Sequence, residues 1–222
     1  MEMTKNGIVY DVKPHGAVVL RPAWKTTPTQ SIKIPSSVFN KEVYRIEAGA
    51  FKNSDILGVI LPLCLESIGE EAFANCKHLS HVEFGKRGDA AKEISVEKRA
   101  FYGCSNLNFV LGKSWWNLEE SAFENCTVMQ FYGMVKTADS KAFKGCRHLD
   151  NLNILLGGKI AIDALDINPN LSVLPCGGPI TYPDIQNIFE SLKEAQATIR
   201  CFPSDNITQL AYEGYKLDVV QV

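Results

Sequence analysis

A five-residue motif, Ala-Phe-x-x-Cys, recurs along the chain and constrains its fold more than any other feature. Full copies begin at residues 72, 100, 122 and 142, and a variant that ends in Ser begins at residue 50. Successive copies start 20 to 28 residues apart, so the motif belongs to a longer repeated unit. A unit of this length cannot bury its apolar face alone, and the copies must therefore stack side by side and share one core.

Apolar residues at fixed distances from the motif predict a short strand in every unit. An LxxLxL-like spacing follows the Ala of most copies at seven, ten and twelve residues, as in Leu79, Val82 and Phe84, with Gly112 as an exception. The first copy has lost one residue, so its strand residues are Ile56, Val59 and Leu61. The same offsets in the copy that starts at residue 122 select Met129, Tyr132 and Met134. Another apolar residue lies four positions before each Ala. These residues are Ile46, Ile68, Val96, Leu118 and Ala138.

A degenerate sixth unit follows the five clear ones. It starts at Ala164, with Leu165 in the position of Phe and Asn168 in the position of Cys. The repeats are therefore assigned to residues 48–176. A polar, Gly-containing insertion at 85–93 lengthens one unit and is predicted to form a loop.

An open stack of repeats needs caps that cover its apolar ends. Residues 1–47 contain short β-type runs and are predicted to form an N-terminal β cap. Residues 177–222 break the repeat and are predicted to form a small α/β C-terminal cap. A helix is expected there from Asp184, and a second short helix is expected after Ser204.

The chain has seven cysteines, and four of them end a copy of the motif. The odd total and the lack of a CxxC pair argue against a disulfide framework and a zinc site. The Cys-x-His pairs at 76–78 and 146–148 do not supply four converging ligands. We interpret the motif cysteines as reduced residues that pack as small hydrophobes, one per unit. No metal and no cofactor are expected.

The repeated segment SIGEEAFANCKHLSHVEF at 67–84, with its copies, resembles the BspA-like leucine-rich repeat proteins. The resemblance extends over residues 30–176. It implies a mostly β, α/β-type repeat protein, a right-handed leucine-rich-repeat solenoid with a curved parallel sheet between the two caps. It also implies a surface or secreted protein, often adhesin-like, without catalytic residues. Residues 1–12 are no signal peptide, so a surface location requires a removed upstream signal, and the chain is otherwise expected in the cytoplasm.

Composition and motifs exclude several functions. The net charge is −2, which gives no general attraction to nucleic acid. No apolar run is long enough to predict insertion into a membrane. The chain lacks a P-loop, a GxGxxG, a GxSxG and an HExxH motif, so an enzyme is not expected.

Strand residues that lie between the inward positions are expected to face solvent. They include eight candidate partner-binding residues: His81, Glu83, Phe109, Leu111, Trp116, Phe131, Asn151 and Asn153. Phe109, Leu111 and Phe131 are predicted to form one exposed apolar patch on neighbouring units, which Trp116 would extend.

These residues favour a non-enzymatic module that binds an unidentified protein or glycan through its sheet. Two alternatives stay open. One is a structural spacer or self-assembling module, since the sequence does not give the oligomeric state. The other is an enzyme whose site lies in the C-terminal segment.

Overall fold

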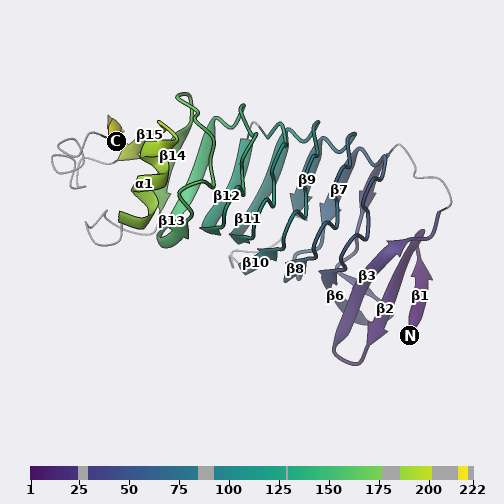
Figure 1. Cartoon of the computed structure of the whole chain (residues 1–222). Helices are drawn as coiled ribbons and strands as arrows, with labels where there is room; N and C mark the ends of the chain where they lie inside the picture. The colour runs from purple at the N-terminus through teal and green to yellow at the C-terminus, as the bar shows by residue number, and fades with distance from the viewer. Residues whose placement is uncertain (25–29, 85–92, 129, 177–185, 202–214, 220–222) are drawn as a thin grey trace.

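The computed structural model describes residues 1–24, 30–84, 93–128, 130–176, 186–201 and 215–219. The chain winds into a solenoid whose coils lie side by side, with a β-meander at the N-terminal end and a helix at the C-terminal end (Figure 1). The mostly β repeat architecture that the motif predicts is confirmed.

An antiparallel meander opens the chain. Its strands are β1 (Glu2–Lys5), β2 (Ile8–Lys13) and β3 (Gly16–Pro22). The last of these pairs in parallel with β6 (Lys41–Ile46), which also forms a hairpin with β5 (Ser37–Val38). The meander therefore continues into the solenoid through hydrogen-bonded strands.

Each coil contributes residues to two columns of parallel strands. The first strand column contains β4 (Ser31–Lys33), β7 (Gly58–Leu61), β9 (His81–Phe84), β14 (Ser172–Cys176), β15 (Thr198–Cys201) and β16 (Lys216–Val219). The second strand column contains β3, β6, β8 (Ser67–Ile68) and β10 (Glu93–Val96). Three long strands pass through both columns. They are β11 (Phe109–Leu118), β12 (Gln130–Ala138) and β13 (Asn151–Ile160).

Alternate strand residues point into the solenoid and form its core. In the first strand column the inward row includes Ile32, Val59, Val82, Val110 and Val173. In the second strand column, the inward row consists of the apolar residues that lie four positions before each motif Ala. They are Ile46, Ile68, Val96, Leu118 and Ala138. Both rows are fully buried, so each coil shares apolar contacts with its neighbours on both sides.

The motif phenylalanines form a continuous stack along the solenoid. Neighbouring rings, from Phe51 through Phe73, Phe101 and Phe123 to Phe143, have centroids 4.9–5.6 Å apart and planes within 8° of parallel. All five side chains are buried. A stacked aromatic pair adds about 1 kcal/mol beyond the burial of its area. The stack therefore fills the space between coils and favours uniform coil spacing.

The motif cysteines form a second row beside the phenylalanine stack. The Sγ of Cys76 donates a hydrogen bond to the carbonyl oxygen of Phe51 in the preceding coil, at 3.0 Å. Cys104, Cys126 and Cys146 repeat this bond to the carbonyl of the preceding phenylalanine at 3.0–3.1 Å. The thiols are thus free and buried, and they act as donors as well as packing groups.

Every motif turn has a left-handed backbone conformation at the residue before its last position. Asn75 and Gly103, each directly before a cysteine, have φ of 57° and 68°. Gly, Asn and Asp adopt such angles most readily. A Cβ atom at Gly103 would lie 2.6 Å from the Asn75 side-chain oxygen, so glycine also leaves room for the asparagine of the coil before it. Glycine thus follows asparagine in the position before the cysteine because it leaves space for the asparagine side chain of the preceding coil.

The unit that begins at Ala122 differs from the predicted spacing by one residue. Val128 and Phe131 are its inward residues, whereas Tyr132 faces solvent. The strand register agrees, because Val110 lies opposite Phe131 and Leu111 opposite Tyr132. The predictions that Tyr132 and Met134 point inward are therefore wrong, and Met129 lies outside the described residues. The turn after Cys126 is one residue shorter than in most units, like that of the first unit, and in a strand one residue exchanges the two faces.

At the C-terminal end, α1 (Gln186–Glu194) packs against the last long strand. Ile188 and Leu192 are buried there, and Ser191 Oγ donates a hydrogen bond to the carbonyl of Ile160 at 2.9 Å. The helix expected from Asp184 is thus present from residue 186. The short helix expected after Ser204 and the loop at 85–92 lie outside the described residues.

We predict that the four motif cysteines are unreactive in the folded protein. Burial raises the pKa of Cys104, Cys126 and Cys146, the last to about 12, and the neighbouring Cys104 thiol together with burial raises that of Cys76. Because the thiolate is the nucleophile, labelling with a disulfide reagent at pH 8 should be more than about 100-fold slower than for a peptide thiol.

The test compares labelling of the native and urea-unfolded protein by peptide mass spectrometry. Cys64 and Cys176, which are only half-buried, serve as internal references. Rapid labelling of Cys104 in the native state would contradict the buried cysteine row.

Candidate partner-binding face

The solvent side of the first strand column carries two rows of outward residues. One unbroken row is set by the strand register and runs through His81, Phe109, Gln130, Asn151, Ser172 and Thr198. A second row, two residues further along each strand, runs through Glu83, Leu111 and Tyr132. A register shift then places Asn153 opposite Met134 rather than opposite Tyr132. We call the outward residues of β9 and β14, and of residues 109–111, 130–132 and 151–153 in β11 to β13, the first-column face.

The centre of this face is apolar and aromatic. Phe109 is 40% exposed and Tyr132 is 53% exposed. Leu111 lies two residues after Phe109 on the same strand and directly opposite Tyr132. The Tyr132 hydroxyl donates a hydrogen bond to Gln130 Oε1 at 2.8 Å, which fixes the ring over its own strand. Large exposed side chains on rigid strands are unusual enough to indicate an interaction site.

The N-terminal side of the face is formed by His81 and Glu83. The His81 ring lies flat on Gly58, where a Cβ atom would come within 2.1 Å of the ring. Its Nδ1 contacts Ser80 Oγ at 3.1 Å, and its Nε2 lies 3.5 Å from Ser31 Oγ. The missing side chain at residue 58 thus holds the imidazole down on the sheet.

The C-terminal side of the face is uncharged and polar. Asn151, Asn153 and Ser172 follow Gln130 on the next two strands. The side chains of Asn151 and Asn153 make no hydrogen bond with any other residue that the structure describes. Charge returns only on β15 and β16, where Arg200 and Asp218 pair at 3.8 Å.

Two of the eight residues predicted to face a partner lie in the core. Phe131 is 2% exposed and Trp116 is fully buried, so neither can contact a partner. Phe131 points inward because of the short turn after Cys126. Trp116 points inward because it lies two residues before Leu118 on β11, with the same alternation. The structure places the other six predicted residues on the first-column face.

Trp116 also explains the glycines at inward strand positions. A Cβ atom at Gly133 would lie 2.2 Å from the indole Nε1, and one at Gly112 would lie 3.4 Å from the indole ring and 2.8 Å from Phe84. The indole occupies the volume that larger residues fill in other coils. It packs edge-on against Phe84 and Phe131, with ring centroids 5.5 and 5.1 Å apart.

Sequence reasoning missed Gln130 and Tyr132 on this face. The signal was present, because counting one residue fewer after Cys126, as for the first unit, aligns Val128 and Phe131 with Ile56 and Val59. Both alignments place an apolar residue at each inward position. Only packing, with Phe131 against Phe123 and Phe143, selects one.

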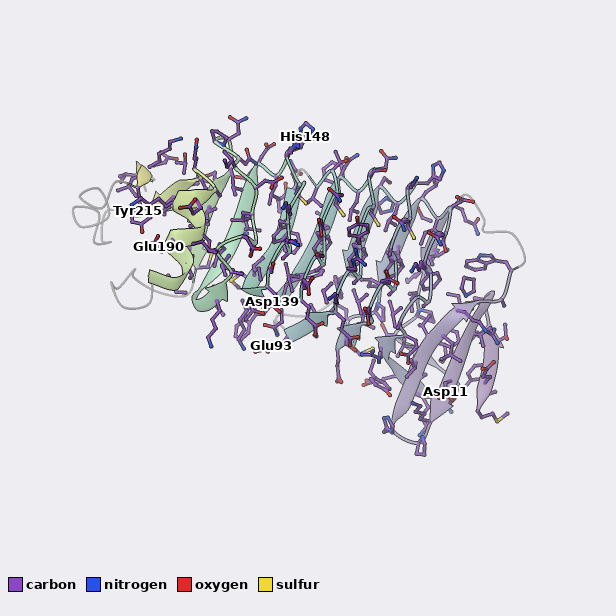
Figure 2. All side chains as sticks on the ribbon, in the orientation of Figure 1. Asp11, Glu93, Asp139, His148, Glu190 and Tyr215 are labelled. Carbon is purple, nitrogen blue, oxygen red and sulfur yellow. The ribbon has the colours of Figure 1, made fainter. Side chains whose placement is uncertain are left out.

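The second strand column has a different outer surface, which is tied together by ion pairs. Arg45 on β6 forms a bidentate pair with Glu97, with Nη2 and Oε2 3.0 Å apart, across β8. Glu93 pairs with Lys136 across β11, and this bond, followed by one from Asn117, lowers the pKa of Glu93. Glu93 lies toward the opposite edge of the solenoid from His148 (Figure 2). The carboxylates of Glu93 and Glu97 thus form ion pairs that link coils of the solenoid.

Among the described residues, no group of three or more His, Cys, Asp and Glu side chains could hold a metal ion. Within the same part of the chain, no helix is both long and apolar enough to cross a membrane.

The stacked coils, the parallel columns and the repeated inward residues define a leucine-rich-repeat solenoid. The family model described as "BspA type Leucine rich repeat region" matches in six copies, at residues 92–161. The chain therefore carries leucine-rich repeats of the BspA type, and the family resemblance is confirmed.

The chain is similar to solved structures of other leucine-rich repeat proteins, and the T. pallidum structure supports the same fold. The leucine-rich repeat protein of T. pallidum superposes with a TM-score of 0.59 at 19% identity, covering 98% of each chain. A leucine-rich repeat protein from Bacteroides ovatus ATCC 8483 superposes with a TM-score of 0.48 at 15% sequence identity. That match covers 98% of this chain and 67% of the other. A leucine-rich repeat protein from Bacteroides capillosus ATCC 29799 superposes with a TM-score of 0.46 at 23% sequence identity. That match covers 60% of this chain and 97% of the other. No curated protein matches by sequence.

We predict that the neighbours Phe131 and Tyr132 differ sharply in their effect on stability. Phe131→Ala should lower the free energy of unfolding by about 3–5 kcal/mol, because it empties a buried ring site. Tyr132→Ala should cost no more than about 1 kcal/mol, because the ring is mostly in solvent. Urea denaturation followed by circular dichroism measures both, and equal costs would contradict the register of β12.

Gly133→Ala should destabilise the protein by about 1–3 kcal/mol, because the added methyl group collides with the Trp116 indole. The smaller ring of Trp116→Phe should relieve the collision, so the two changes should be less damaging together than their sum. A double-mutant cycle measures this coupling. Simple additivity would show that the two sites do not touch.

Proposed function

We propose that the chain is a non-enzymatic recognition module that binds its partner through the first-column face. The observation that carries the proposal is the exposed pair Phe109 and Tyr132, with the half-buried Leu111 beside them, at the centre of that face. These residues contribute nothing to the core, and exposed aromatic side chains commonly supply most of the energy of a binding site.

The rigidity of the face supports the same function. Each outward residue sits on a strand whose inward neighbours are buried and whose backbone is paired on both sides, as for Phe109 between His81 and Gln130. A binding face whose backbone is already ordered loses little backbone entropy when a partner binds.

A surface or secreted location, which the leucine-rich-repeat resemblance favours if an upstream signal was removed, belongs to this proposal. So does an adhesin-like role, in which the module attaches a cell to an external molecule.

The double change Phe109→Ala with Tyr132→Ala should abolish binding and leave the melting temperature within about 2 °C of the unchanged protein. The measurement is binding of the labelled protein to arrays of purified extracellular proteins and of glycans. The matched control is Ile162→Ala with Ile167→Ala, which removes two exposed apolar residues near the turn after β13.

Loss of binding in the control alone would move the site to that turn. Binding that is equally strong in all three proteins would overturn the proposed face.

A further inference from the structure

The first-column face contains an uncharged window four strands wide. At residues 109–111 of β11, 130–132 of β12, 151–153 of β13 and 172–174 of β14, the outward register positions hold only apolar, amide and hydroxyl side chains. These are Phe109, Leu111, Gln130, Tyr132, Asn151, Asn153, Ser172 and Leu174. Charge appears immediately outside the window, at Glu83 on β9 and at Arg200 on β15. A charged partner would find no complementary group inside it.

We infer that this window binds a neutral linear glycan, which lies across strands β11 to β14. The inference rests on the proposed recognition function and names the chemical class of its partner.

The side chains match the two surfaces of a sugar ring. A pyranose presents a face of C–H groups, which packs on an aromatic ring, and an edge of hydroxyl groups. Phe109 and Tyr132 offer two aromatic rings on neighbouring strands, at 40% and 53% exposure. The hydrogen bond from Tyr132 to Gln130 Oε1 fixes one of them before any ligand arrives.

The amides supply the polar half of the contact. An amide side chain carries both donors and an acceptor, which suits a hydroxyl group that donates and accepts. The amides of Asn151 and Asn153 have no partner among the described residues, and the amino group of Gln130 is not used by its bond to Tyr132. Three neutral amides therefore lie beside two aromatic rings.

The spacing of the face suits a chain of sugars. Neighbouring strands are about 4.8 Å apart, close to the length of one sugar in an extended chain. The unbroken row Phe109, Gln130, Asn151 and Ser172 therefore offers one contact group per sugar over about four sugars. A chain that crosses the strands meets an aromatic ring first and polar groups afterwards.

The two aromatic rings of the window present a small apolar area. Phe109 and Tyr132, at their observed exposure, present on the order of 200 Å². A standard protein interface covers about 800 Å² on each side, and its energy is concentrated in a central apolar cluster. The narrow pair of rings flanked by amides fits a glycan better.

The test begins with an array of neutral linear glucans, mannans, xylans, galactans and chitin oligosaccharides, beside sulfated and uronic-acid glycans. The best neutral ligand is then titrated calorimetrically as a series of one to six sugars. Affinity should rise up to about four sugars and then level off, as the four-strand window predicts. It should change less than about twofold between 0.05 and 0.5 M salt, because no ion pair is involved.

Variants connect the binding to the window. Phe109→Ala and Tyr132→Ala should each weaken binding of the four-sugar ligand at least about tenfold, and Asn151→Ala about tenfold. Ile162→Ala, which lies outside the face, should change it less than about twofold.

The outcomes separate this inference from the proposed function. Capture of a purified protein through Phe109 and Tyr132, with no neutral glycan bound, would overturn the glycan and keep the recognition face. Binding only to sulfated or uronic-acid glycans would also overturn it. Binding of any ligand that survives both aromatic changes would overturn the inference and the proposed face together.

Discussion

Hydrogen bonds between successive motif turns are the interaction on which the rest of the structure depends. The amide of each motif phenylalanine donates to the carbonyl of the next motif alanine at 2.7–2.8 Å, from Phe51 to Ala72 through Phe143 to Ala164. Each turn thus fixes the next one, and the phenylalanine and cysteine rows repeat at the same spacing. Differences in unit length are absorbed away from this ladder, in the turn after the cysteine and in the insertion before β10.

The two strand columns that this ladder aligns have different outer surfaces. The second column uses its outward side chains for ion pairs between coils, such as Arg45 with Glu97 and Glu93 with Lys136. The central strands of the first column carry exposed aromatic and amide side chains, which form no ion pairs between coils. The exposed aromatic side chains support the proposed recognition function of that column.

Much of the fold could be predicted, because the motif carries its own constraints. Ala-Phe-x-x-Cys combines a small residue, a large core residue, a left-handed turn residue and a small donor, and few structures satisfy all four at a fixed spacing. Six of the eight proposed contact residues could be placed for the same reason, since they follow motif turns of regular length, as His81 and Asn151 do. The inward position of Trp116 was also predictable, because Trp116 lies two residues before the inward Leu118 and strand residues two apart face the same side.

Sequence by itself thus determined the stacked repeat, the inward rows and the reduced cysteine row, because these recur in register and each copy supports the others. Tertiary structure alone decided which of Phe131 and Tyr132 faces solvent. Both residues suit either position locally, and a one-residue difference in the preceding turn exchanges them. The side-chain volume available inside the solenoid decides between the two residues. Phe131 fits between Phe123, Phe143 and the Trp116 indole, and Gly133 leaves the space that the indole requires.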